Sequence, residues 1–387
     1  MIMDGGMGTT LQSPPFELEL GSALWSYQSS LPMFLPPQDS YTEQDVEQAM
    51  QTMLSALTLA SSKTISSIPS NERERPQAPA LALSLGPFGA QCQPGQEYSG
   101  LYPRPFGSKE TPSKFGYNDS ASQACGQLPL DAIQHITSTW KEQDLERDYL
   151  AAWHLQRLRH FSMSEAWSSI GVIAFETIPL LREVEAIRLA MHVFNVDNWI
   201  MSGLSNVTTP YYISFVFPLN EQGEPKFPDS DLQHLNLNKQ IEQLIEQTFF
   251  GQLMNETKDL PNGFGINCTN PDHIEKIVEI FLKVLNERII KQEQQQQQTC
   301  EIKPWIVLYP DGGAVYDAVF TKTWSNPTGM DETQWSLKLV NSIKHALDRR
   351  RDDGQLLLGG VVAGGCCKAS PRYITALRKA CLDRGLL

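Results

Sequence analysis

Short apolar runs alternate with amphipathic stretches along most of this sequence, and this alternation constrains the fold more than any other feature. The runs are apolar throughout and end at turn-forming or polar residues, a pattern typical of parallel strands buried on both faces. They cover residues 80–85, 172–175, 211–217, 263–266, 305–308 and 356–362. The amphipathic stretches predict helices at 43–60, 146–159, 181–193, 238–249, 273–289, 332–350 and 371–384.

Strand–helix alternation over this length predicts an α/β protein, and the number of repeats indicates a (β/α)8 barrel of the TIM type. A doubly wound sheet is the alternative. It usually carries a glycine-rich dinucleotide loop, and the glycines at 5–8 do not match G-x-G-x-x-G. We therefore expect one barrel domain over 1–387. Polar, proline-bearing or glutamine-rich stretches near 61–79, 100–130 and 292–300 are expected to be surface insertions, the last a disordered loop.

Composition excludes several classes of function. The net charge of −13, with no cluster of Lys or Arg, argues against nucleic-acid or anionic membrane partners. No apolar run approaches the roughly 18–20 residues that span a bilayer, and the first residues do not resemble a signal peptide. Seven cysteines, an odd number, fit reduced thiols better than a disulfide framework, so a cytoplasmic location is expected.

Three cysteines follow two of the apolar runs. Cys268 comes after 263–266, and Cys366 and Cys367 follow Gly364-Gly365. In a barrel, the carboxyl ends of the strands form the active face, so these thiols would converge there. Neighbouring strand residues point to opposite faces; Cys366 and Cys367 could share one ligand only if the chain leaves strand geometry, a freedom that the glycines supply.

Three thiolates and one open position make a zinc site of the catalytic type. The open position can accept a substrate thiol and deprotonate it. Spacing alone leaves two alternatives, because no CxxC pair is present: ordinary buried cysteines, or a vicinal disulfide between Cys366 and Cys367.

Six ordered motifs resemble the homocysteine S-methyltransferase family, which is related to betaine–homocysteine methyltransferase and to the homocysteine domain of cobalamin-dependent methionine synthase. The resemblance covers almost the whole chain, so it is far more specific than any single motif. The motifs are Asp4-Gly5-Gly6-Met7-Gly8-Thr9-Thr10-Leu11, Gly86-Pro87-Phe88-Gly89-Ala90 with Glu97-Tyr98-Ser99-Gly100, Ala174-Phe175-Glu176-Thr177-Ile178-Pro179, Gly265-Ile266-Asn267-Cys268, Tyr309-Pro310-Asp311-Gly312-Gly313 and Gly364-Gly365-Cys366-Cys367.

The resemblance implies that zinc (Zn2+) is the cofactor and that Cys268, Cys366 and Cys367 are its ligands. It implies that Asp4 and Glu176 recognise the amino-acid part of homocysteine. Taken alone, Glu176 could instead be a first-turn helix residue and Asp4 a turn former.

Gly5 and Gly6 permit close approach of the backbone, whose N–H groups could bind a carboxylate. A plain turn explains these glycines equally well. The histidines are scattered, and we expect His154 and His160 to be surface or interface residues rather than ligands.

The implied reaction moves a methyl group from S-methylmethionine or S-adenosylmethionine to homocysteine, giving methionine. Betaine is a weaker candidate donor, and selenocysteine a possible acceptor. A sulfonium leaves as a neutral thioether, so no catalytic residue beyond the zinc site is expected. Phe88, Tyr98 and Trp25 could face the cation, although packing roles are favoured for all three.

The sequence departs from the family at two places. Asp311 replaces a common Asn, which adds charge near the rim without touching a proposed ligand. The segments ending at Ser26 and beginning at Tyr27 abut, where related sequences insert a β-α unit of roughly 30 residues or more. The alternative function is therefore a catalytically impaired zinc- and homocysteine-binding remnant. The long C-terminal extension of the betaine enzymes is absent, which favours a monomer.

Overall fold

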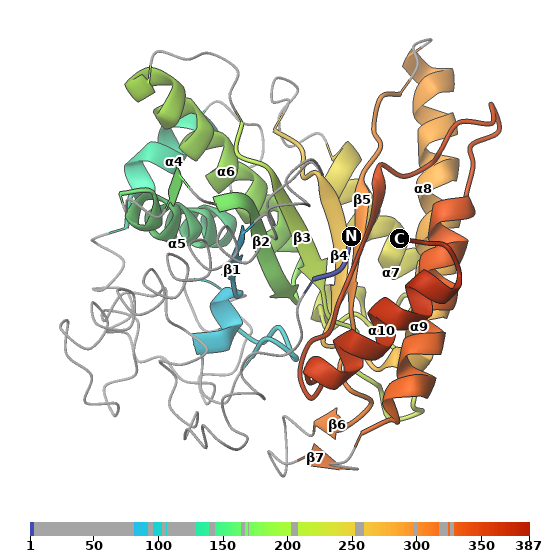
Figure 1. Ribbon diagram of the computed structural model, residues 1–387. Coiled ribbons are helices and arrows are strands. Elements are labelled where there is room, and N and C mark those ends of the chain that lie inside the picture. The colour runs from blue at the N-terminus through green and yellow to red at the C-terminus, as the bar shows by residue number, and fades with distance from the viewer. Residues whose placement is uncertain are drawn as a thin grey trace, which may run out of the picture.

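The computed structural model describes residues 1–3, 81–91, 96–102, 106, 128–138, 144–163, 167–168, 170–202, 208–251, 259–296, 300–316, 324–325 and 329–387. Its centre is a parallel sheet with the strand order β1-β2-β3-β4-β5-β8 (Figure 1). The strands are β1 Leu81–Leu85, β2 Ile170–Ile178, β3 Tyr211–Phe215, β4 Gly263–Asn267, β5 Trp305–Tyr309 and β8 Gly360–Ala363. A separate antiparallel pair joins β6 Val315–Tyr316 and β7 Trp324–Ser325.

Helices connect successive strands and flank the sheet. Figure 1 shows α4, α5 and α6 beside the first three strands, and α7 to α10 beside the last three. The helices are α4 Leu130–Thr137, α5 Leu145–Ser162, α6 Leu181–Ser202, α7 Leu237–Ile245, α8 Ile274–Gln296, α9 Glu332–Asp348 and α10 Pro371–Asp383, with short turns at Phe88–Gln91, Ser230–Leu232, Glu246–Phe250 and Pro271–His273. Several begin at a capping side chain; the Asp144 carboxylate, for example, accepts the Arg147 N–H at 3.0 Å.

The two faces of the sheet carry different side chains. Residues such as Phe175 and Ile213 pack with the helices in the main hydrophobic core. Their strand neighbours Ala174 and Tyr212 belong to a small second cluster on the opposite face, which we call the inner face. The alternation follows from the two-residue period of a strand. At the carboxyl ends, the same alternation leaves polar residues on the inner face.

The first residues of the chain extend the sheet beyond β8. Ile2 forms a parallel bridge with Ala363, Ala363 N–H donates to Met1 O at 3.0 Å, and Met3 N–H donates to Ala363 O at 2.8 Å. The order of the strands rises steadily along the chain, without the reversal that defines a doubly wound sheet. The parallel α/β prediction is therefore confirmed. Closure into eight units, with one early unit missing, stays a prediction, because the abutting segments at Ser26 lie outside the described residues.

Several sequence expectations are wrong in detail. The glutamine-rich stretch is helical as far as Gln296, where α8 ends; glutamine and glutamate are good helix formers, so the helix continues through it. In the stretch 100–130, Tyr102, Phe106 and Leu128 are buried in the main core. The last apolar run forms a strand only from Gly360 onward.

Among the described residues, no helix combines the length and apolarity needed to cross a membrane.

Candidate metal and substrate site

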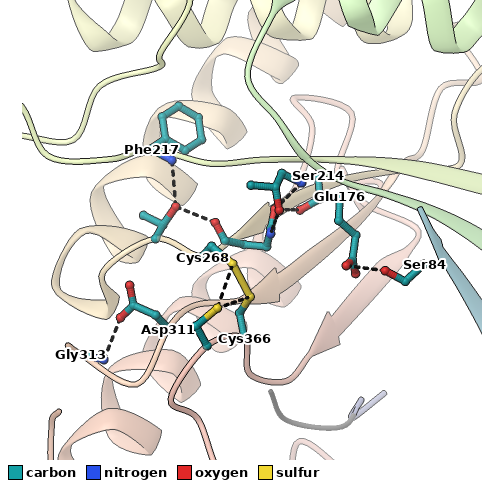
Figure 2. Close-up of a disulfide and its surroundings, with 12 residues drawn as sticks. Ser84, Glu176, Ser214, Phe217, Cys268, Asp311, Gly313 and Cys366 are labelled. Carbon is teal, nitrogen blue, oxygen red and sulfur yellow. Dashed lines mark hydrogen bonds between the residues drawn. A yellow bond between two sulfur atoms is a disulfide. The ribbon is translucent and has the colours of Figure 1, made fainter. Parts of the chain in front are cut away.

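Three cysteine sulfurs converge at the carboxyl ends of β4 and β8. Cys268 and Cys366 form a disulfide, and the Cys367 Sγ lies 3.9 Å from each of the other two sulfurs. All three lie within 4.8 Å of one another (Figure 2). The predicted convergence is thus confirmed, although the two segments are 98 residues apart. The vicinal pairing of Cys366 with Cys367 is wrong, because the bonded partner of Cys366 is Cys268.

Backbone hydrogen bonds fix the loop that carries Cys366 and Cys367. The strand β8 ends at Ala363, so the two cysteines lie outside strand geometry, as their shared position requires. Cys366 N–H donates to Pro310 O, and Cys367 O accepts from Gly312 N–H, both at 2.8 Å. A Cβ on Gly312 would lie 2.5 Å from Lys368 O, so only glycine permits this approach. The loops after β5 and β8 therefore act as one unit.

Backbone strain is concentrated at the same end of the sheet. Within the described chain, the non-glycine residues with positive φ are Thr177 at 61°, Cys268 at 44° and Lys368 at 62°. One of them is a predicted ligand, and the other two directly follow Glu176 and Cys367. Such conformations cost about 1–3 kcal/mol each and persist where the surroundings enforce them. At Thr177 the Asn267 side chain does so, since it accepts from Thr177 N–H at 3.1 Å and donates to Thr177 Oγ1 at 2.7 Å.

The geometry of the sulfurs fits a metal ion. Thiolates about 2.3 Å from a tetrahedral ion lie about 3.8 Å from one another. Two of the three sulfur pairs are already 3.9 Å apart. Reduction of the Cys268–Cys366 bond would free the other two donors beside Cys367, and soft thiolate donors select ions such as zinc. The group can therefore hold one metal ion.

The surroundings of Cys367 oppose a free thiolate. Burial raises the pKa of the Cys367 thiol, and together with the charges of Asp311 and Glu97 brings it to about 11. The sequence suggested that Asp311 lies near the rim of the site, but Asp311 is buried. Burial raises the pKa of its carboxyl to about 7, although Gly313 N–H donates to it at 2.7 Å. A cation would be needed to deprotonate Cys367 near neutral pH.

Glu176 presents a carboxylate at the end of β2. It lies inside the strand, while α6 begins at Leu181, so the alternative of a first-turn helix residue is wrong. Ser84 Oγ donates to Glu176 Oε2 at 2.6 Å, in a hydrogen bond that solvent can reach (Figure 2). Tyr309 is buried nearby; burial raises the pKa of its hydroxyl well above the usual 10, and Glu176 adds to the effect. This side of the site offers an accessible anion suited to an ammonium group.

Comparison with known proteins assigns the chain to a family. The family model described as Homocysteine S-methyltransferase matches residues 25–381. The chain belongs to the homocysteine S-methyltransferase family. It is 24% identical over 303 residues to Homocysteine S-methyltransferase 3 of Arabidopsis thaliana, covering 78% of this chain and 57% of that protein. It is 25% identical over 304 residues to Homocysteine S-methyltransferase 2 of Zea mays, covering 78% of this chain and 59% of that one.

The chain thus spans somewhat more than half the length of these curated relatives. Among solved structures, it is similar to the oxidized form of the homocysteine methyltransferase MmuM from Escherichia coli. The TM-score is 0.45 and the identity 16%, over 98% of this chain and 95% of that chain.

Within this family member, the structure places some predicted residues and not others. It brings Cys268, Cys366, Cys367 and Glu176 to one end of the sheet, whereas Asp4, Gly5 and Gly6 lie outside the described residues. Ser84 was not expected at the site. Its signal is the alternation in β1, where Leu83 and Leu85 are buried in the main core and Ser84 faces the other side.

Two other residues considered in the sequence analysis, Phe88 and His154, have packing roles. Phe88 is fully buried and stacks on Phe106 with ring centroids 3.9 Å apart, which confirms a core role. His154 is buried rather than on the surface, and its Nε2 lies 3.0 Å from Glu183 Oε1. The same Oε1 accepts Phe88 N–H at 2.8 Å, so this pair supports the turn after β1.

Proposed function

We propose that this protein transfers a methyl group from a sulfonium donor, S-methylmethionine or S-adenosylmethionine, to the thiol of homocysteine, giving methionine. In this proposal Cys268, Cys366 and Cys367 bind zinc in their reduced state. The observation that carries it is the meeting of three sulfurs within 4.8 Å at the end of the sheet, in a member of this family.

Zinc, when bound, would accept the substrate thiol at its fourth position and hold it as a thiolate at neutral pH. The protein's own residues would then position the rest of homocysteine. Glu176 pairs with the ammonium group, and the hydrogen bond from Ser84 Oγ keeps its Oε2 oriented toward the inner face. Asp4, Gly5 and Gly6 complete the proposal, with Asp4 a second acidic partner and the glycine N–H groups binding the carboxylate.

The methyl transfer needs no proton at the reacting atoms. A bond forms between the homocysteine sulfur and the methyl carbon, while the bond from that carbon to the donor sulfur breaks. The electron pair of the broken bond stays on the donor sulfur, which leaves as a neutral thioether. The protein contributes alignment of the two sulfurs, and well-oriented reactions gain about 7–11 kcal/mol in this way.

The same proposal covers the wider setting of the protein. We propose a single domain of the (β/α)8 type over 1–387, acting as a monomer in the cytoplasm, where thiols stay reduced. Its partners are homocysteine, or selenocysteine as an alternative acceptor, and the methyl donor. Neither nucleic acid nor a membrane is required.

An impaired remnant that binds zinc and homocysteine without turnover is the second candidate, since the segments on either side of Ser26 and Tyr27 abut. One experiment separates the two. Full-length protein is purified under reducing conditions, its zinc is counted, and methionine formation is measured with homocysteine and each of S-methylmethionine, S-adenosylmethionine and betaine.

One zinc per chain and turnover with a sulfonium donor are expected. One zinc per chain without methionine from any donor would select the remnant. Folded, reduced protein that binds no zinc would refute both.

A further inference from the structure

A tight turn after β1 holds Glu97 at the end of the sheet that carries the thiols. Gln96 N–H donates to Gly89 O, and Gly100 N–H donates to Gln96 O, both at 2.8 Å. Gly100 has a φ of 67°, and a Cβ there would lie 2.7 Å from Leu180 Cδ2. The turn is thus fixed against the residues that follow β2.

The Glu97 side chain carries an oxygen that the described protein does not satisfy. Its Oε2 is fully buried and has no hydrogen-bond partner. Burial raises the pKa of the carboxyl to about 7, and the opposing influence comes from its own backbone rather than from a lysine or arginine. Its charge also reaches the thiol of Cys367. Glu97 as a residue is half-buried, but a carboxylate oxygen that is buried without a partner is costly, so this group is suited to a cationic ligand.

Four positive groups could enter this site under the proposed function: the metal ion, the ammonium group of homocysteine, and the ammonium and sulfonium groups of the donor. Among the described residues, only the three cysteines place ligand atoms within 4.8 Å of one another, so Glu97 lies outside the metal group. The ammonium of homocysteine is assigned to the accessible carboxylate of Glu176, with which it can form hydrogen bonds.

The sulfonium differs from the two ammonium groups because it has no N–H donor, and from the metal ion because it forms no coordinate bonds. It needs a nearby anion rather than a hydrogen-bonding partner. We infer that Glu97 is the counter-charge that recognises the sulfonium group of the methyl donor. This inference rests on the proposed function and names a residue that selects the donor.

The charge of the donor disappears during the reaction, since the bond from sulfur to the methyl carbon breaks and the electron pair stays on the donor sulfur. Glu97 therefore stabilises the bound donor more than the transition state or the neutral thioether product. Its loss weakens donor binding without slowing the chemical step, and it appears in the KM for the donor rather than in kcat.

The test compares two ligands that differ only in charge. Homoleucine is the neutral isostere of S-methylmethionine, with a CH group in place of the sulfonium sulfur. Calorimetric titration of each ligand into the zinc-loaded protein, without homocysteine, measures binding without turnover. The variants are Glu97→Gln and, as a matched control, Glu185→Gln. Burial also raises the pKa of Glu185 to about 7, but its charged neighbours are Arg147, Asp144, Arg182 and Arg188 rather than the thiols.

Wild-type protein is expected to prefer S-methylmethionine to homoleucine by about 10- to 100-fold, in line with the loss of one buried charge partner. Glu97→Gln should lose most of that preference, with homoleucine affinity and zinc content unchanged, and Glu185→Gln should keep it. In steady-state kinetics, Glu97→Gln should raise the donor KM without lowering kcat.

Equal binding of the two ligands by the wild-type protein would overturn the inference without any variant. An unchanged preference in Glu97→Gln, an equal loss of both ligands, or a loss of zinc would also overturn it. Failure of the proposed function has a different signature, namely wild-type protein that lacks zinc or forms no methionine.

Discussion

The thiol side and the carboxylate side of the site are built in different ways. The sulfurs of Cys366 and Cys367 are fixed by backbone hydrogen bonds to the loop after β5, and Cys268 directly follows β4. On β1 and β2, the described support of the Glu176 carboxylate is a side-chain hydrogen bond from Ser84. Loss of any one of the three thiols should abolish metal binding. A change to the side chains that hold the Glu176 carboxylate should weaken homocysteine binding only in part. The difference predicts abrupt effects on one side and graded effects on the other.

The largest effect is expected from Cys367→Ser. It removes one of three donors, so we expect zinc to be lost and turnover to fall by about 10³-fold or more, because the homocysteine thiol is then neither deprotonated nor aligned. Zinc content and methionine formation check this. Cys381→Ser is the matched control, since Cys381 is a buried free cysteine on α10 outside the cluster. Full activity in Cys367→Ser would show that the three thiols do not hold a metal ion needed for the reaction.

Glu176→Gln should act on homocysteine alone. Loss of the negative charge opposite an ammonium costs about 2–3 kcal/mol, which corresponds to a rise in the homocysteine KM of roughly 30- to 150-fold. The zinc content should not change, as measured by metal analysis on the same preparation. If the variant loses zinc, zinc binding by the thiols and ammonium binding by Glu176 do not act independently, contrary to the proposal.

Asp311→Asn should stabilise the reduced, metal-free protein in a pH-dependent way. Burial raises the pKa of this carboxyl from 3.8 to about 7 in the folded state. Below pH 3.8 the residue is protonated in both states; as the pH rises to about 7 the unfolded state ionises first, so wild-type stability falls. Denaturant unfolding at pH 4 and pH 8 should show a gain for Asp311→Asn that grows by about 2 kcal/mol, below the full value of the shift because local relaxation reduces it.

Asp352→Asn is the control for this comparison. Asp352 is exposed, and its replacement changes the net charge of the protein by the same amount as Asp311→Asn. It should show no comparable growth. A gain for Asp311→Asn that is equal at both pH values would mean that ionisation of this group is not the cause.

The smallest effect is expected from Ser84→Ala. It removes one hydrogen bond to Glu176 Oε2, worth about 0.5–1.5 kcal/mol, so the homocysteine KM should rise by roughly 2- to 10-fold. Steady-state kinetics at saturating donor measure it. An effect as large as that of Glu176→Gln would show that the carboxylate side is also all-or-none.

Much of the fold could be predicted because the apolar runs mark the strands directly. The run at 211–217 and the helix from Leu181 were found, since burial on both faces and helical periodicity are local signals. The convergence of the thiols followed from the rule that parallel strands share one carboxyl edge. Burial of Tyr102 and His154 could not be predicted, because it depends on how the turn after β1 packs against α5 and α6.

The finer features of the site were beyond sequence reasoning for a similar reason. The meeting of the three thiols could be predicted, but the bond between Cys268 and Cys366 depends on the exact position of each sulfur, and the sequence suggested only the adjacent Cys366–Cys367 pair as a disulfide. Likewise the unsatisfied oxygen of Glu97 is a property of packing, which no motif records.

The central claim is that three sulfurs share one metal ion and leave a position for the substrate thiol. X-ray absorption at the zinc edge tests it most directly on reduced, full-length protein. Three sulfur ligands at about 2.3 Å are expected, with a fourth on addition of homocysteine. A zinc shell of nitrogen and oxygen alone, or a sulfur count that homocysteine does not change, would contradict the account.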